Sequence, residues 1–206
     1  MDKSVSNLRV GITGGIGSGK SFICRKLEAL GYPVYDCDEN AKRIMTRDVQ
    51  VVSSLVRLVG EEIYQIDSVK GSRVLNKSLL ASYIFGNPNH AAAVNAIVHP
   101  AVKRDFLRWA NQEDSDIIFL ESAILYESGF DDVVDKVFFV SAPESVRIQR
   151  AVQRDHSNES LIRARIRSQA SESEILPKAD FVIQNDGVED IDSQLAAVLA
   201  EIKKNI

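Results

Sequence analysis

A short glycine-rich segment near the amino terminus constrains this sequence most. It runs Gly14-Gly15-Ile16-Gly17-Ser18-Gly19-Lys20-Ser21 and matches the pattern G-x-x-x-x-G-K-[ST]. An apolar, β-branched run from Leu8 to Thr13 precedes it, and a helical pattern from Ser21 to Leu30 follows it. In this context the pattern forms a P-loop, a turn whose backbone N–H groups surround phosphates at a helix N-terminus. A glycine turn that only joined a strand to a helix would not require Lys-Ser at this offset.

The P-loop predicts an ATP site with distinct roles for its last two residues. We expect Lys20 to contact the β- and γ-phosphates and the Ser21 hydroxyl to bind Mg²⁺, which we predict as the cofactor. The segment residues that we expect to bind ATP are Gly15, Ile16, Gly17, Ser18, Gly19, Lys20 and Ser21.

A P-loop alone does not distinguish a kinase from a motor ATPase or a GTPase switch. The guanine-reading pattern Asn-Lys-x-Asp is absent, since Asn185 is followed by Asp186 and Gly187. A chain of 206 residues leaves no room for the additional domains of most motors. The sequence therefore favours a small-molecule kinase. Two alternatives stay open, a kinase of the nucleoside monophosphate type and a switch that binds a partner and hydrolyses nucleotide slowly.

Four further runs rich in Val, Ile and Phe alternate with helical patterns. They predict an α/β fold of the P-loop NTPase type, with three α/β/α layers around a parallel five-stranded sheet. These runs are Pro33 to Asp36, Asp116 to Glu121, Lys136 to Ser141 and Phe181 to Gln184.

The chain length favours one domain, which we divide into three regions. The segment from Ala41 to Asn111 is mostly helical in pattern and far longer than one crossover needs, which indicates a substrate-binding insertion. The regions are a nucleotide core at about 8–40, 115–145 and 178–206, a helical insertion at about 41–112, and a lid at about 146–172.

Two carboxylates, Asp36 and Asp38, follow the second predicted strand. Open α/β sheets bind ligands at this edge, and residues i and i+2 of a strand face the same side, so both could meet one ligand. Phosphoryl transfer to an alcohol uses a carboxylate that accepts or orients the hydroxyl proton, and we assign this catalytic role to Asp38. The alternative is that Asp38 only caps a helix beginning at Glu39.

Arginines are concentrated after the fourth predicted strand, opposed only by Asp155 and Glu159. Arg150 and Arg154 are four residues apart on a predicted helix and share a face. We expect Arg150 to bind ATP and Arg154 to act in catalysis from a lid over the transferred phosphate. A solvated helix face is the alternative. The arginines of this run are Arg147, Arg150, Arg154, Arg163, Arg165 and Arg167.

Two more residues are candidate substrate contacts. Glu127 follows the third predicted strand, although a surface helix position would also explain it. His99 precedes Pro100 inside the helical insertion, where Pro either kinks a helix or starts the next one. A packing or hydrogen-bonding role for His99 is the alternative, and a direct chemical role is disfavoured because phosphoryl transfer needs little proton chemistry.

Charge and composition limit the partners. A formal net charge of −4 provides no field for nucleic acid or an anionic membrane, so we expect small-molecule substrates. The segment from Met1 to Asn7 lacks the apolar run of a secretory signal, and no run is long enough to span a bilayer. We therefore expect a cytoplasmic protein, as a monomer or small homo-oligomer. Cys24 and Cys37 form no metal-binding or disulfide pattern and are expected to be buried thiols.

Taken together, these motifs resemble one family, the dephospho-coenzyme A kinases, which catalyse the last step of coenzyme A synthesis. The resemblance spans nearly the whole chain and implies that ATP and dephospho-coenzyme A are the substrates. It further implies that Asp38 serves the ribose 3′-hydroxyl and that Asp36 and His99 lie near the acceptor. The motifs are the segment from Gly11 to Ser21, Asp36-Cys37-Asp38, Ile84-Phe85, His99-Pro100, Leu125-Tyr126-Glu127, Gln153-Arg154-Asp155, Arg165-Ile166 with Gln169, and Asn185-x-Gly187.

Asn185 and Gly187 are similar to the family's closing motif, and we expect both to belong to the ATP site. The sequence departs from the family at three places. Lys42 and Lys77 stand where the family commonly has Arg, and Ala123 stands where it usually has Pro. A Lys keeps the charge but loses the two-pronged guanidinium, so contacts to the acceptor's phosphates at these positions are left unassigned.

Overall fold

The computed structural model describes residues 7–67 and 71–204, which form two compact units. The first unit comprises Met1–Asp36 and Ala110–Ile206, and the second comprises Cys37–Trp109. The first six residues, on which the expected lack of a secretory signal partly depends, lie outside the described residues. The functional division into core, insertion and lid stays a prediction.

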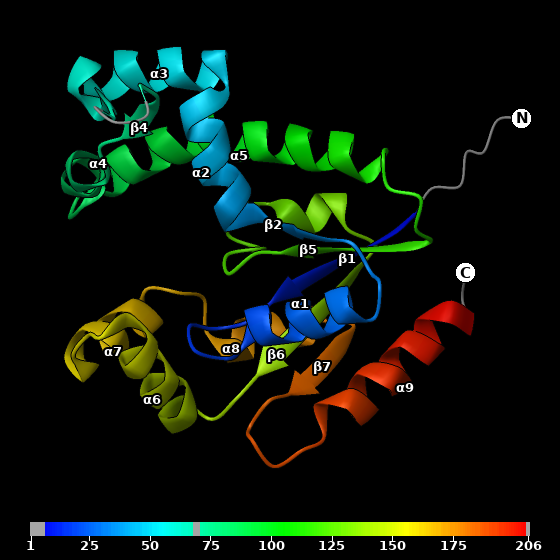
Figure 1. The fold of residues 1–206 in the computed structure, drawn as a ribbon. Coiled ribbons are helices and arrows are strands. Elements are labelled where there is room, and N and C mark those ends of the chain that lie inside the picture. Colours follow the sequence, from blue (N-terminus) through cyan, green and yellow to red (C-terminus); the bar gives the residue numbers. More distant parts are fainter. Residues whose placement is uncertain (1–6, 68–70, 205–206) are drawn as a thin grey trace, which may run out of the picture. The chain divides into compact units, whose positions relative to one another are not determined.

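A five-stranded parallel sheet in the order β2-β5-β1-β6-β7 forms the centre of the first unit (Figure 1). β1 lies in the middle, paired with β5 on one side and β6 on the other. This arrangement confirms the predicted α/β sheet. The strands are β1 (Leu8–Thr13), β2 (Val34–Asp36), β5 (Ile117–Glu121), β6 (Lys136–Ser141) and β7 (Phe181–Gln184).

Helices α1 and α9 pack on one face of this sheet, where their apolar side chains meet those of the strands (Figure 1). Four consecutive residues of β5 are buried, because a central parallel strand is covered on both faces. The helical elements of this unit are α1 (Lys20–Ala29), η2 (Phe130–Val133), α6 (Glu144–Asp155), α7 (Glu159–Arg167), α8 (Glu172–Ile175), η3 (Leu176–Lys178) and α9 (Ile191–Lys204).

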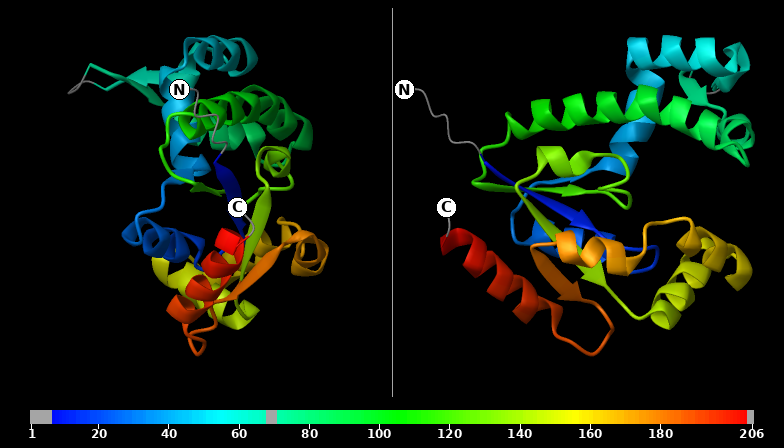
Figure 2. Two further views of the ribbon diagram at one scale, coloured as in Figure 1. Left: turned by 90° about the vertical axis from the view of Figure 1, so that its right-hand side faces the viewer. Right: turned by 180° about the vertical axis from the view of Figure 1, so that it is seen from behind.

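The second unit is mostly helical, as expected, but it also contains a short antiparallel hairpin that the sequence did not reveal (Figure 2). Each hairpin strand is only three residues long, too short for a period-2 pattern to be recognised. The elements are α2 (Cys37–Arg47), α3 (Val49–Val59), η1 (Glu61–Ile63), β3 (Tyr64–Ile66), β4 (Arg73–Leu75), α4 (Lys77–Ile84) and α5 (Pro88–Ala110).

Helix α5 continues through Pro100, so the two helical patterns on either side of His99-Pro100 belong to one helix. Proline removes one backbone hydrogen bond from a helix interior, and the rest of this 23-residue helix tolerates that loss. Cys24 and Cys37 are free, buried thiols, as predicted. In the part of the chain that the structure describes, no helix has the length and apolarity that crossing a bilayer demands.

The aromatic centre of the sheet gives a test of the packing. Phe138 is fully buried, and its ring lies edge-on to Phe119 at 5.6 Å and to Phe181 at 5.5 Å between centroids. Phe138→Ala should reduce the free energy of unfolding by about 3–5 kcal/mol, because it removes a large side chain and leaves a cavity. Urea denaturation followed by circular dichroism would measure the change.

The matched control is Val182→Ala on neighbouring β7, where the side chain is 37% exposed. It should cost less than about 1 kcal/mol, as surface substitutions usually do. Equal losses in the two variants would contradict the placement of the core.

Candidate functional site

The P-loop occupies residues 14–19, between the end of β1 at Thr13 and the start of α1 at Lys20. Gly17 and Gly19 have φ angles of 77° and 97°, a region that side chains with a Cβ rarely adopt. A Cβ on Gly19 would lie 2.1 Å from Asn185 Nδ2, and one on Gly17 would lie 2.1 Å from the Arg147 carbonyl oxygen. Both backbone angle and close packing therefore require glycine at these positions.

Asn185, predicted as part of the ATP site, holds the loop from behind. Its buried side chain donates from Nδ2 to the Ser18 carbonyl oxygen at 2.7 Å, and its own carbonyl accepts from Arg150 Nη1 at 2.8 Å. It follows directly after β7, where its N–H donates to Ser141 at the end of β6. The P-loop is thus fixed to the sheet through Asn185, while Gly187 lies beyond it with a φ of 92°.

Gln169 holds the loop from the other side. Its Oε1 accepts from the Ile16 N–H at 2.8 Å, and its Nε2 donates to the Ala123 carbonyl at 3.3 Å. One amide therefore joins the P-loop, the segment after β5 and the segment after α7. To contact a phosphate, as the sequence predicts, the Ile16 N–H would first have to leave Gln169.

Lys20 and Ser21 begin α1 at the carboxyl end of the sheet. Lys20 Nζ donates to the Gly14 carbonyl at 2.9 Å, which folds this side chain back over the loop. Ser21 Oγ donates to Glu121 Oε1 at 3.1 Å, and Glu121 is the register partner of Asp36 across β5 and β2. A hydroxyl and two carboxylate residues therefore come together beside the P-loop.

A cavity of about 290 Å³ opens beside this loop. Lys20 and Ser21 line it together with Arg150 and Arg154, which confirms that these two arginines share a face of α6. Polar donors from two helices thus surround one space of a size that suits a small ligand. The full lining is Gly17, Gly19, Lys20, Ser21, Phe22, Arg25, Arg150, Ala151 and Arg154.

A second cavity, of about 310 Å³, adjoins the beginning of the P-loop. Gly14, Gly15 and Gln169 line it together with Glu127. Glu127 Oε1 also accepts from the Ala170 N–H at 3.2 Å. Although its side chain is exposed, Glu127 lies beside the loop and is tied to the segment after α7, so it is more than a solvated helix residue.

The two remaining candidates, Asp38 and His99, lie in the second unit. β2 ends at Asp36 and α2 begins at Cys37, so the expectation that Asp36 and Asp38 share one side of a strand is wrong. The capping alternative is wrong as well, since Asp38 lies within the first turn of α2. Its exposed carboxylate there interacts favourably with the helix dipole. His99 is half-buried, and burial, with Lys103 nearby, lowers its pKa below the usual value.

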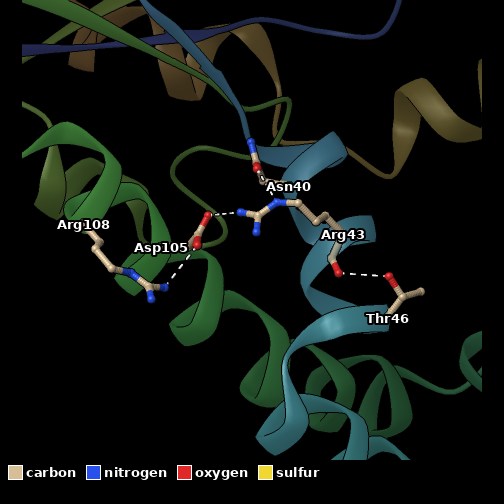
Figure 3. Close-up of polar contacts among 5 residues, drawn as sticks. All are labelled: Asn40, Arg43, Thr46, Asp105 and Arg108. Carbon is tan, nitrogen blue, oxygen red and sulfur yellow. Dashed lines mark hydrogen bonds and ion pairs between the residues drawn. The ribbon is translucent and has the colours of Figure 1, made fainter. Parts of the chain in front are cut away.

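Arg43, the residue after Lys42, is engaged within the second unit (Figure 3). Its guanidinium pairs with Asp105 of α5 and donates from Nε to Asn40 Oδ1 at 3.1 Å. Asp105 also accepts from Arg108 Nη2 at 3.1 Å. Arg43 therefore joins α2 to α5, and its position next to Lys42 does not make it a replacement for the arginine that the family commonly has there.

The comparisons with known proteins agree with this site. The sequence model described as dephospho-CoA kinase matches residues 8–190. The chain belongs to the dephospho-CoA kinase family. A dephospho-CoA kinase of Bacteroides fragilis is 45% identical over 200 residues, which cover 97% of this chain and 95% of that protein. One of Porphyromonas gingivalis is 40% identical over 179 residues, which cover 86% of each chain.

Solved structures support the fold of this dephospho-CoA kinase family member. A crystal structure from Thermus thermophilus has a TM-score of 0.80 and 33% identity, and covers 95% of this chain and 97% of its own. A shikimate kinase from Bacteroides thetaiotaomicron has a TM-score of 0.54 and 15% identity, with 95% and 98% covered. The latter likeness shows the α/β P-loop fold alone.

Three residues of the site were not on the predicted list. Glu121 could have been found, since an acid at the carboxyl end of a strand beside the P-loop lies at the ligand-binding edge. Gln169 belongs to a recognised motif, but nothing in the sequence shows which backbone groups it binds. Arg147 is buried with its guanidinium against Gly15, whereas its neighbours in sequence suggested only a charged helix face.

The loop geometry predicts that Gly19→Ala reduces ATP affinity about 10-fold or more. The added Cβ would collide with Asn185 and move the loop, and the loss of even one charge-assisted hydrogen bond has this effect. Isothermal titration calorimetry with ATP would measure it.

Gly31→Ala is the matched control at the other end of α1. Gly31 has a similar φ of 89°, but no atom lies within 4 Å of an added Cβ. Its cost should be limited to roughly 1–2 kcal/mol of left-handed backbone strain, with ATP affinity unchanged. Similar ATP affinities in the two alanine variants would contradict the role given to the Gly19–Asn185 contact.

Proposed function

We propose that this chain transfers the γ-phosphate of ATP to the 3′-hydroxyl of dephospho-coenzyme A. The observation that carries the proposal is the P-loop whose Lys20 and Ser21 share a cavity with Arg150 and Arg154, in a member of the dephospho-CoA kinase family. Phosphoryl transfer depends on positioning and on neutralising charge, and this cavity offers cations from two directions.

We assign the donor side to the first unit. The backbone of residues 15–19 surrounds the ATP phosphates, with Asn185 and Gly187 behind it, and Arg150 contacts the nucleotide. Lys20 exchanges the Gly14 carbonyl for phosphate oxygens. Arg154 neutralises the charge that develops on the transferred group, and the α6–α7 region acts as the lid.

The residues beside the loop suit Mg²⁺, which prefers oxygen ligands. Ser21 Oγ and Glu121 Oε1 already lie 3.1 Å apart, and both are oxygen donors. Among the described residues no cluster of three or more His, Cys, Asp or Glu forms a metal cage. That agrees with an ion held largely by substrate phosphates. When bound with ATP, Mg²⁺ neutralises phosphate oxygens and orients them for transfer.

We assign the acceptor side to residues that the family resemblance singles out. Asp38 accepts or orients the 3′-hydroxyl proton, while Asp36, His99 and Glu127 contact the acceptor. The lowered pKa of His99 keeps its ring neutral at pH 7, which suits a hydrogen-bonding contact better than an ion pair. Cytoplasmic location and a monomeric or small homo-oligomeric state stay predictions of the sequence.

Incubation with Mg-ATP and dephospho-coenzyme A should yield coenzyme A, identified by mass and by chromatography against authentic material. Lys20→Ala should stay folded and lose at least about 100-fold in kcat, because one cation near the γ-phosphate is removed. Lys26→Ala is its control, since Lys26 lies on the same helix but pairs with Asp192 at 2.6 Å. Its rate should be nearly normal. Efficient phosphorylation of a nucleoside monophosphate with no coenzyme A formed would favour the rival kinase class.

Asp38→Asn should lower kcat far more than ATP affinity, because size and polarity stay while the proton-accepting charge is lost. Single-turnover rates at saturating ATP and dephospho-coenzyme A would measure the effect.

The matched control is Glu39→Gln. Glu39 is also an exposed acid in the first turn of α2, so it shares the interaction with the helix dipole. Its loss should cost only stability, measured by thermal melting. If both variants turn over at the wild-type rate, Asp38 is not catalytic.

A further inference from the structure

One carboxylate at the end of α6 binds two arginines from different helices. Arg154 Nε donates to Asp155 Oδ1 at 2.7 Å, and Arg154 Nη2 lies 3.2 Å from Oδ2. Arg165 Nη1, from α7, donates to the same Oδ2 at 3.2 Å. The carboxylate is largely shielded, whereas both guanidiniums are more than half exposed. Asp155 thus brings two cations together while leaving much of each accessible.

The position of Asp155 is unfavourable for an acid unless these arginines explain it. It is the last residue of α6, where the negative end of the helix dipole repels a carboxylate. The hydrogen bond from Arg154 and the nearby Arg165 nevertheless hold the pKa of Asp155 below its usual value, so it stays charged. His156, which follows, is left-handed with a φ of 47°, the one non-glycine residue with positive φ in the described part of the chain.

We propose that Asp155 is a positioning residue that fixes Arg154 for phosphoryl transfer and holds Arg165 next to it. The proposal rests on the function proposed above. Arg154 lines the cavity that contains Lys20 and Ser21, and an unrestrained arginine would populate many rotamers there. A donor that is already oriented needs no reorganisation when charge develops on the phosphoryl group. Asp155 accepts two of the donors of Arg154 and leaves its Nη1 for a phosphate oxygen.

A nearby ion-pair group separates positioning from simple attachment of the lid helices. Arg163 of α7 pairs with Glu144 of α6 at 2.9 Å and with Glu159 of its own helix at 2.8 Å. Like Asp155, this group links α6 and α7 through a carboxylate. Arg163, however, is not among the residues that line the cavity with Lys20. Removing Glu144 or Glu159 therefore weakens lid structure without releasing Arg154.

The experiment compares Asp155→Asn, Asp155→Glu and the control Glu159→Gln at saturating ATP and dephospho-coenzyme A. Asp155→Asn should lower kcat about 10-fold or more, the scale expected for a misplaced catalytic group, with a smaller change in the KM for ATP. Asp155→Glu should recover part of the loss, because it restores the charged acceptor. Glu159→Gln should turn over at the wild-type rate. A rate increase in Asp155→Asn would overturn the proposal, since the carboxylate would then be restraining Arg154.

A double-mutant cycle with Arg154→Ala provides the readout that a structural role would not change. If Asp155 acts through Arg154, adding Asp155→Asn to Arg154→Ala should lower kcat no further. Multiplying losses would show that Asp155 only supports the fold, which refutes the proposal. If the wild type makes no coenzyme A, the function proposed above fails, and ATP hydrolysis rates of the same variants then test Asp155 separately.

Discussion

The contact between Gly19 and Asn185 is the constraint on which the phosphate site depends. The loop backbone can turn into the first residue of α1 only because no Cβ separates Gly19 from the Asn185 amide, which holds the Ser18 carbonyl. Asn185 in turn is fixed at the ends of β6 and β7. The direction of the loop N–H groups is therefore set by the buried sheet, which is the most rigid part of the unit.

The same anchoring explains why β1 is central. A loop at the carboxyl end of β1 has β5 and β6 on either side, so residues after both neighbours reach it. Glu121 at the end of β5 meets Ser21, and the arginines of α6, which follows β6, line the cavity. An edge strand would have had only one such neighbour. Strand order thus supplies the site with an acid from one side and cations from the other.

The sequence predicted the sheet, the P-loop and the shared face of Arg150 and Arg154 because each depends on local pattern or spacing. It could not predict contacts made by single side chains over long separations. Gln169 and Ile16, 153 residues apart, are one such pair. The error at Asp38 has a local cause, since β2 ends two residues earlier than the argument needed. Three-residue strands such as β2 leave no margin for arguments from alternation.

The arginine run shows why residue type alone does not assign a role. Arg147, Arg150 and Arg154 recur along one helix, yet the first is buried against Gly15, the second binds the Asn185 carbonyl, and the third is shared with Asp155. A guanidinium bound to a neutral carbonyl keeps its full charge for a ligand, whereas one paired with a carboxylate is partly neutralised but better oriented. Arg150 is thus suited to attracting the nucleotide. Arg154 is suited to the transferred group, where direction matters more than total charge.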